Sequence, residues 1–73
     1  MYKIINVDKT SAISTIVRLS HIINGYNYVI VNGVCIKYET LEYKAEVLGF
    51  LINDKIVSYI HIDDIKTVER KTM

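Results

Sequence analysis

The sequence has one cysteine, Cys35, and no proline or tryptophan among its 73 residues. A single cysteine excludes an internal disulfide bond and a cysteine-based zinc cage, and it fits a reducing compartment. An excess of charge of one sign is also missing, because nine Lys/Arg stand against eight Asp/Glu for a net charge of +1. The basic residues are scattered along the chain, so strong nonspecific DNA binding is not expected.

Long apolar runs are absent as well. No stretch approaches the roughly 18 apolar residues of a membrane span, and the first residues lack the pattern of a secretory signal. We therefore expect a cytoplasmic protein with no membrane partner. No linker, low-complexity tract or internal repeat divides the sequence, so residues 1–73 are expected to form one small domain.

Catalytic motifs are missing too. The chain contains no Gly-rich phosphate loop, no Ser/His/Asp set and no dinucleotide fingerprint. So few residues can seldom build both a core and a preorganised catalytic cleft. We expect a protein that is not an enzyme and that needs no cofactor.

β-branched residues dominate what is present. Ile, Val and Thr together make up more than a third of the chain, and six tyrosines accompany them. These residue types favour strands over long helices. The chain is 51% hydrophobic, and a domain of this size can bury only roughly 60% of the surface of its unfolded chain. We therefore expect a mainly β domain that hides its remaining apolar surface by forming a homo-oligomer.

The segment 11–24 admits two interpretations. Apolar residues recur there with helical spacing at Ala12, Ile16, Leu19 and Ile23. This spacing predicts an amphipathic helix over 11–24, with Gly25 as its C-terminal cap. The rival is a strand over 15–23 that turns at Asn24-Gly25, a favourable hairpin dipeptide. The helix is preferred, and the strand remains open.

Turn residues divide the remainder of the chain into five strands. The strands are expected over Tyr26–Val31, Val34–Glu39, Tyr43–Ile52, Ile56–Ile62 and Ile65–Glu69. Asn32-Gly33 joins the first two as a hairpin, and Asn53-Asp54-Lys55 joins the next two. The patterns predict one N-terminal helix followed by five strands.

Alternation assigns faces to two of these strands. In 56–62, the core face holds Ile56, Ser58, Ile60 and Ile62, and the other face holds Val57, Tyr59 and His61. In 43–52, Leu48, Phe50 and Ile52 face one side, while Val47 and Leu51 face the other. Because a small domain has one interior, the second apolar face is expected to meet another subunit.

Three short motifs follow one another along the chain. Val31–Ile36 reads Val-Asn-Gly-Val-Cys-Ile, Tyr59–Ile62 reads Tyr-Ile-His-Ile, and Ile65–Val68 reads Ile-Lys-Thr-Val. They resemble the Val-Asn-Gly-Val-x-Leu, Tyr-Lys-His-Ala and Ile-Ser-Thr-Ile of the bacterial Hfq branch of the Sm-like small barrels. The resemblance covers about residues 11–68. It implies a five-stranded Sm-like or SH3-like small barrel that assembles as a ring and binds uridine-rich RNA.

The sequence departs from the family pattern at several positions. Ile60 stands where the family has a lysine, and Asp63-Asp64 are inserted before the last strand. Leu41-Glu42-Tyr43 replaces an Asp-Asn-Phe loop, which keeps the aromatic and loses the amide. No glycine lies between Gly33 and Gly49 to bend the second strand. These departures weaken the implied RNA binding more than the implied barrel.

Tyr59 and His61 are the leading candidate ligand-binding residues. Both lie opposite the expected core face, where the tyrosine ring could stack on a base and the imidazole could hydrogen-bond it. Their alternative role is packing between subunits. Tyr43, Asn53 and Lys55 could add a second ring, an amide and a phosphate contact from loop positions. The last two also fit a simple turn.

Metal binding and cysteine chemistry are not expected. His61 and Asp63 could share a metal ion, yet a zinc site needs three or four ligands, and no further His or Cys supports them. The Asp63-Asp64 pair is expected to hydrogen-bond turn amides. Cys35 has apolar neighbours on both sides and no histidine near it in the sequence, so we expect a small buried residue.

The leading functional hypothesis is a non-catalytic oligomeric barrel that binds a nucleotide or a short single-stranded nucleic acid and acts by sequestration or regulation. The abundance of Ile, Lys, Asn and Tyr suggests an AT-rich genome such as that of a phage. In a phage, the ligand could be a host signalling nucleotide. The alternative is a phage or bacterial protein-interaction module that docks on a host protein, such as a defence protein, and inhibits it.

Overall fold

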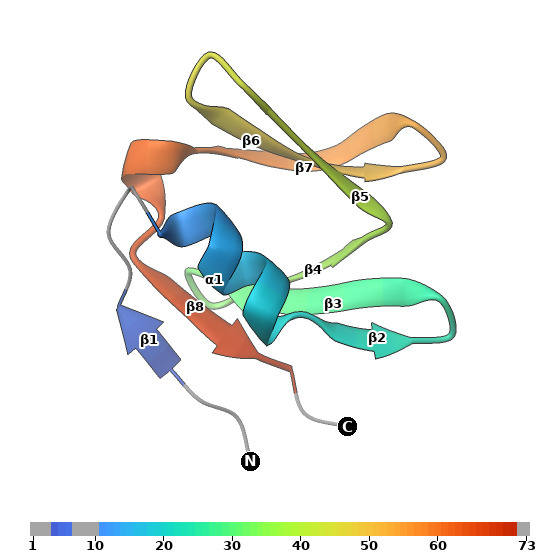
Figure 1. The fold of residues 1–73 in the computed structure, drawn as a ribbon, viewed down its shortest axis with the longest axis horizontal. Coiled ribbons are helices and arrows are strands. Elements are labelled where there is room, and N and C mark those ends of the chain that lie inside the picture. Colours follow the sequence, from blue (N-terminus) through green and yellow to red (C-terminus); the bar gives the residue numbers. More distant parts are fainter. Residues whose placement is uncertain (1–3, 7–10, 72–73) are drawn as a thin grey trace.

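The computed structural model describes residues 4–6 and 11–71 of the chain (Figure 1). Its elements in order are β1 (Ile4–Asn6), α1 (Ala12–Leu19), β2 (His21–Ile23), β3 (Tyr26–Val31), β4 (Val34–Tyr38), β5 (Thr40–Lys44), β6 (Val47–Ile52), β7 (Lys55–His61), the short 3-10 helix η1 (Ile62–Asp64) and β8 (Thr67–Arg70). The described part of the chain is therefore mainly β with one α-helix, as the composition predicts.

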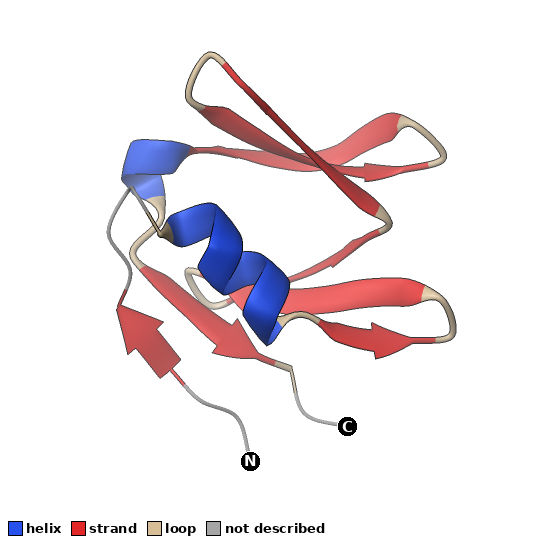
Figure 2. Ribbon diagram, viewed as in Figure 1, coloured by secondary structure: helices blue, strands red, loops and turns tan. Residues whose placement is uncertain are grey.

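The strands form two antiparallel sheets (Figure 2). In the first sheet, β3 pairs with β4 along one edge and with β2 and then β8 along the other, and β1 adds to β8. In the second sheet, β6 lies between β5 and β7. The chain passes between the sheets at Glu39, whose N–H donates to the Leu51 carbonyl at 2.7 Å.

The hydrophobic core lies between the two sheets, and α1 packs on it against β8 and β3 (Figure 1). Its largest fully buried side chains are Phe50, Ile16, Leu48, Val29 and Val68. The rings of Tyr38 and Phe50, one from each sheet, meet edge to face with their centroids 5.4 Å apart. Such an aromatic pair adds about 0.5–1.5 kcal/mol beyond the burial of its area, so it helps to hold the sheets together.

The segment 11–24 combines the two interpretations that the sequence allows. The helix ends at Leu19, because Ser20 is extended and its hydroxyl donates to the Ile16 carbonyl at 2.6 Å. The next residues form β2, which turns at Asn24-Gly25 and pairs with β3. The prediction of a helix through residue 24 is therefore wrong in its second half, where the hairpin dipeptide decides the structure.

The predicted strand 43–52 is broken by a turn at Ala45-Glu46. Both residues have positive φ, +51° and +63°, as a two-residue hairpin turn requires. Residues with a Cβ rarely adopt this region, and the conformation costs on the order of 1 kcal/mol or more per residue. The pairing of β5 with β6 imposes it, because this register sets Leu41 opposite the buried Phe50.

The prediction of five strands is also wrong, since the described residues form eight. β1 and β2 are additional, and β5 is separate from β6. In the described part of the chain, β4 pairs with β3 alone and β7 with β6 alone. The two sheets are therefore not joined into a closed barrel.

A β-bulge in β7 changes which residues face the core. Phe50 pairs with Ser58 and Leu51 pairs with Ile56, which leaves Val57 as an extra residue. The bulge reverses the alternation, so Ile56 lies on the outer face and is 55% exposed instead of facing the core. Beyond the bulge the prediction is confirmed, since Ile60 packs against the core and Ile62 is buried.

The side chain of Asn32 ties the β3–β4 turn to the last strand. Its Oδ1 accepts hydrogen bonds from the N–H groups of Lys66 (2.7 Å) and Thr67 (3.1 Å). Its Nδ2 donates to the Asp64 carbonyl at 2.7 Å. The turn thereby fixes the chain between η1 and β8, although Asn32 itself is exposed.

Replacing Asn32 by glycine should destabilise the protein by about 2–4 kcal/mol, because three hydrogen bonds of about 0.5–1.5 kcal/mol each are lost. The matched control is Asn24→Gly, since Asn24 has a similar positive φ before a glycine in another hairpin. Glycine tolerates both backbones, so the comparison isolates the side-chain bonds. Urea unfolding monitored by circular dichroism measures the difference, and equal stability of the two variants would contradict this role for Asn32.

At the end of α1, the hydroxyl groups of Ser20 and Tyr38 form a partly buried chain of hydrogen bonds. The Tyr38 hydroxyl lies against Ser20 Oγ, and since the Ser20 hydroxyl donates to the Ile16 carbonyl, Tyr38 is the donor to Ser20. Burial raises the pKa of Tyr38 above its ordinary value. The folded protein thus holds the Tyr38 proton more tightly than the unfolded chain does.

Because the pKa of Tyr38 is raised in the folded state, its contribution to stability is complete below the ordinary tyrosine pKa of about 10 and is lost as pH rises above it. We expect the free energy of unfolding to fall in this alkaline range, and to fall less steeply in Tyr38→Phe. Tyr59→Phe, which alters an exposed ring, should keep the parent slope. Urea titrations between pH 8 and 11 measure how steeply the free energy of unfolding falls with pH. If it falls as steeply in Tyr38→Phe as in the parent, titration of Tyr38 does not contribute to the alkaline loss of stability.

Candidate functional site

The outer face of the β5–β6–β7 sheet carries the leading candidate residues. The strand register places Gly49 between Glu42 and Tyr59, Val47 between Lys44 and His61, and Leu51 between Thr40 and Ile56. We call the side of the sheet formed by Val47, Gly49, Leu51, Ile56, Tyr59 and His61 the Tyr59 face. Its residues point away from the core positions Leu48 and Phe50, which are fully buried.

Gly49 lies at the centre of the Tyr59 face and is buried. It has no side chain, and a Cβ placed there would lie 3.7 Å from the side chains of Leu51 and Ile56. The two apolar side chains therefore border the glycine from one side. Tyr59 is its cross-strand neighbour on β7 and is 72% exposed. The face thus presents an exposed aromatic ring next to a buried glycine that Leu51 and Ile56 border.

His61 follows Tyr59 on the same face, at the end of β7. Its Nδ1 accepts a hydrogen bond from the Asp63 N–H at 3.2 Å and lies 3.7 Å from Asp63 Oδ2. The ring is thereby oriented by the first residues of η1. Two residues along a strand are about 6.6 Å apart, so one small planar ligand could touch both Tyr59 and His61.

The other predicted site residues lie apart from this pair. Tyr43 is 51% exposed, but it pairs with the buried Leu48 and so belongs to the opposite face of the sheet. Asn53 occupies the β6–β7 turn, where its N–H donates to Glu39 Oε1 at 2.7 Å. Lys55 begins β7, six residues from His61, or about 20 Å along an extended strand. The structure therefore unites Tyr59 with His61 and separates Tyr43, Asn53 and Lys55 from them.

Carboxylates accompany the Tyr59 face. Glu42 lies across Gly49 from Tyr59, and Glu46 and Asp63 lie beside His61. Lys44, next to Val47, is the basic residue in the same cross-strand rows. A phosphate group near Tyr59 would meet more negative than positive side chains, so this face does not resemble a site for a long polyanion.

Sequence reasoning missed Glu46 and Gly49 as parts of this region. Glu46 falls within the predicted strand 43–52, and only the unforeseen turn at 45–46 brings it next to His61. Gly49 carries no chemical signal of its own, since it contributes only a buried backbone position across from Tyr59. By contrast, the outward orientation of Tyr59 and Leu51 is confirmed by the register.

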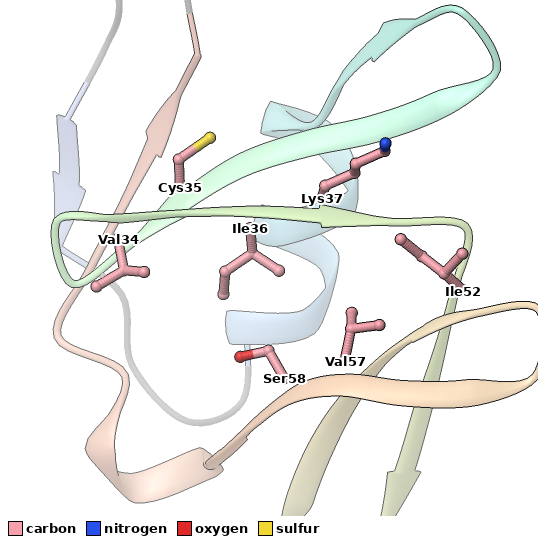
Figure 3. A pocket seen from close by; sticks show the side chains of 7 residues that line it. All are labelled: Val34, Cys35, Ile36, Lys37, Ile52, Val57 and Ser58. Atoms are coloured by element: carbon pink, nitrogen blue, oxygen red, sulfur yellow. The ribbon is translucent and has the colours of Figure 1, made fainter.

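A shallow groove of about 350 Å³ opens between β4 and the bulged part of β7 (Figure 3). Ile36, Val57 and Ser58 point toward one another across it, while Cys35 and Lys37 lie on the other side of β4. The prediction that Cys35 is buried is wrong, because it pairs with Ile30 on the outer face and Ile36 takes the inner position. The groove contains no nucleophile paired with a base.

Comparison of the chain with protein-family models, with curated proteins and with solved structures gave no match. Within the described residues, no helix is both long and apolar enough to span a membrane.

Proposed function

We propose that this chain is a non-catalytic, self-associating binding protein that holds a nucleotide or a short single-stranded nucleic acid on the Tyr59 face. The observation that carries the proposal is the 72% exposed ring of Tyr59 on an outer sheet face that also carries Leu51, Ile56 and His61. An exposed aromatic ring on a sheet face can stack on any base, because every base has a π-face. His61, on the same face, can supply a hydrogen bond to the base edge.

The charge of the face supports a ligand with few phosphates. Glu42 lies near Tyr59, and the net charge of the chain is only +1. Affinity for a long nucleic acid comes largely from cations that contact phosphates, and this face offers few of them. A single nucleotide, such as a signalling nucleotide, or a short RNA suits it better, with sequestration as the mode of action in a cytoplasmic setting.

We also propose that the fold is a modified Sm-like or SH3-like small barrel. With β4 and β5 taken as one strand bent at Glu39, the order after β2 is five strands with a short helical turn before the last, which returns to β3. The added β1 and β2 and the unpaired edges of β4 and β7 depart from that plan.

Self-association would use the apolar residues around the β4–β7 groove. Val34, Ile56 and Val57 are each more than half exposed, and Val34 and Val57 line the groove. Covering these side chains would stabilise the assembly by roughly 25 cal/mol for each Å² of apolar surface removed from water. Ile56 belongs both to this surface and to the Tyr59 face, so the contact between subunits would lie next to the Tyr59 ring.

A second candidate function is docking on another protein. Leu51 and Ile56 next to Tyr59 form an apolar and aromatic surface of the kind that protein interfaces use. The edge of β4 that no described strand pairs with could also accept an added strand. In this case the chain would act as an inhibitor or adaptor of its partner, for example a phage protein directed at host defence.

The substitution Ile56→Glu should dissociate the oligomer, because it places a charge in the apolar contact. The matched control is Val17→Glu on α1, since Val17 is 57% exposed and Ile56 is 55% exposed. Multi-angle light scattering at high micromolar concentration should give an oligomer for the parent and the control and a monomer for Ile56→Glu. A monomeric parent would rule out self-association.

The substitution Tyr59→Ala should weaken ligand binding about tenfold or more, since a base stacked on an aromatic ring contributes about 1–3 kcal/mol. Tyr43→Ala is the control, because Tyr43 is an exposed tyrosine on the opposite face of the same sheet. The parent is first titrated by calorimetry against nucleotides, cyclic dinucleotides and short RNAs. The best ligand is then titrated against both variants.

The outcomes of this titration separate the two candidate functions. Binding that weakens in Tyr59→Ala and persists in Tyr43→Ala supports the nucleotide site. Equal binding by both variants and the parent would place the site elsewhere. If the whole panel fails to bind at millimolar concentration, the protein-docking function is favoured.

A further inference from the structure

We propose that Glu46, His61 and Asp63 form a binding site for one divalent transition-metal ion. Each residue offers one ligand atom, an imidazole nitrogen or a carboxylate oxygen, and these atoms all lie within 4.8 Å of one another. An ion at about 2.0–2.2 Å from each of three ligands requires ligand separations of this order or shorter. Small side-chain movements would therefore bring the three groups to one ion.

Backbone contacts hold the three residues together. Glu46 lies in the β5–β6 turn and the other two lie at the β7–η1 junction, so they come from segments well separated in the sequence. The Ile62 N–H donates to the Glu46 carbonyl at 2.8 Å. The next residue, Val47, pairs with His61 in the sheet. Backbone contacts thus hold the two segments together next to the three ligands. Little conformational entropy is therefore lost when the ligands are brought to one ion.

The donor set selects the class of ion. One imidazole and two carboxylates suit Zn²⁺, Ni²⁺ or Mn²⁺, whereas Mg²⁺ and Ca²⁺ prefer oxygen ligands alone. Three protein ligands leave at least one coordination position for water, and His61 and Asp63 are both partly exposed to solvent. The site would therefore hold an exchangeable ion with an open position.

Two negative charges beside the imidazole favour the bound ion electrostatically. The present hydrogen bond from the Asp63 N–H occupies His61 Nδ1. An ion bound at Nε2 would leave this bond in place, and an ion bound at Nδ1 would replace it. Both proposals use His61, but neither metal geometry uses Tyr59, so the Tyr59→Ala titration tests base stacking without testing the metal site.

Calorimetric titration with ZnCl₂ and NiCl₂ tests the site in the full chain. We expect one ion per chain for the parent, with MgCl₂ giving much weaker heats. His61→Ala should lose at least tenfold in affinity, and Glu46→Gln and Asp63→Asn should each weaken binding. The controls are His21→Ala, which removes the other histidine, and Asp54→Asn, which removes an exposed turn carboxylate. Both should bind as the parent does.

Further measurements exclude zinc binding by Cys35 and unfolding of the variants as explanations. The exposed Cys35 thiol could itself bind zinc, so the titration is repeated in a Cys35→Ser background, where binding should persist. Circular dichroism confirms that each variant is folded, and NMR of the imidazole carbons should show the His61 signals moving while those of His21 stay. Parental affinity in folded His61→Ala, loss of binding in Cys35→Ser, or movement of the His21 signals alone would overturn the proposal.

Discussion

The hydrogen bonds of the Asn32 side chain fix the path by which the chain returns to its first hairpin. They hold the segment from Asp64 to Thr67 against the β3–β4 turn, so that β8 pairs with β3 and can carry β1 on its far edge. The return of the chain buries Ile65 and Val68 in the core. It also sets the position of η1, and with it the orientation of His61 and Asp63. An exposed polar side chain thus organises both the core and the edge of the candidate site.

The amount of apolar surface is the second constraint. A chain of this size cannot bury all of its isoleucine and valine side chains, and the bulge at Val57 turns Ile56 outward just where the groove between β4 and β7 opens. Three of the exposed apolar residues, Val34, Ile56 and Val57, lie at or next to this groove, while Ile22 and Val17 are exposed on β2 and α1. The group at the groove is what supports a binding or self-association surface, since isolated exposed apolar residues need no explanation.

The charges around the Tyr59 face limit the kinds of ligand that it can bind. The Tyr59 ring offers stacking area, but the neighbouring Glu42 and the Glu46–His61–Asp63 corner are acidic. Stacking without neighbouring cations suits a small base-containing ligand or an aromatic protein side chain, and it does not suit a long polyphosphate backbone. A cation bound at the corner would change this balance locally, because it would add positive charge beside the acidic side chains.

The sequence by itself determined the features that depend on neighbouring residues. Asn24-Gly25, Asn32-Gly33 and Asn53-Asp54 adopt positive φ and place the hairpin turns. Alternation correctly set Leu48 and Phe50 inward and Tyr59 outward. Only the tertiary structure decided the turn at Ala45-Glu46, the bulge at Val57, the exposure of Cys35 and the approach of Glu46 to His61. These features arise from cross-strand register, which depends on how distant segments pack around the core, and such packing can force ordinary residues into conformations that their own preferences disfavour.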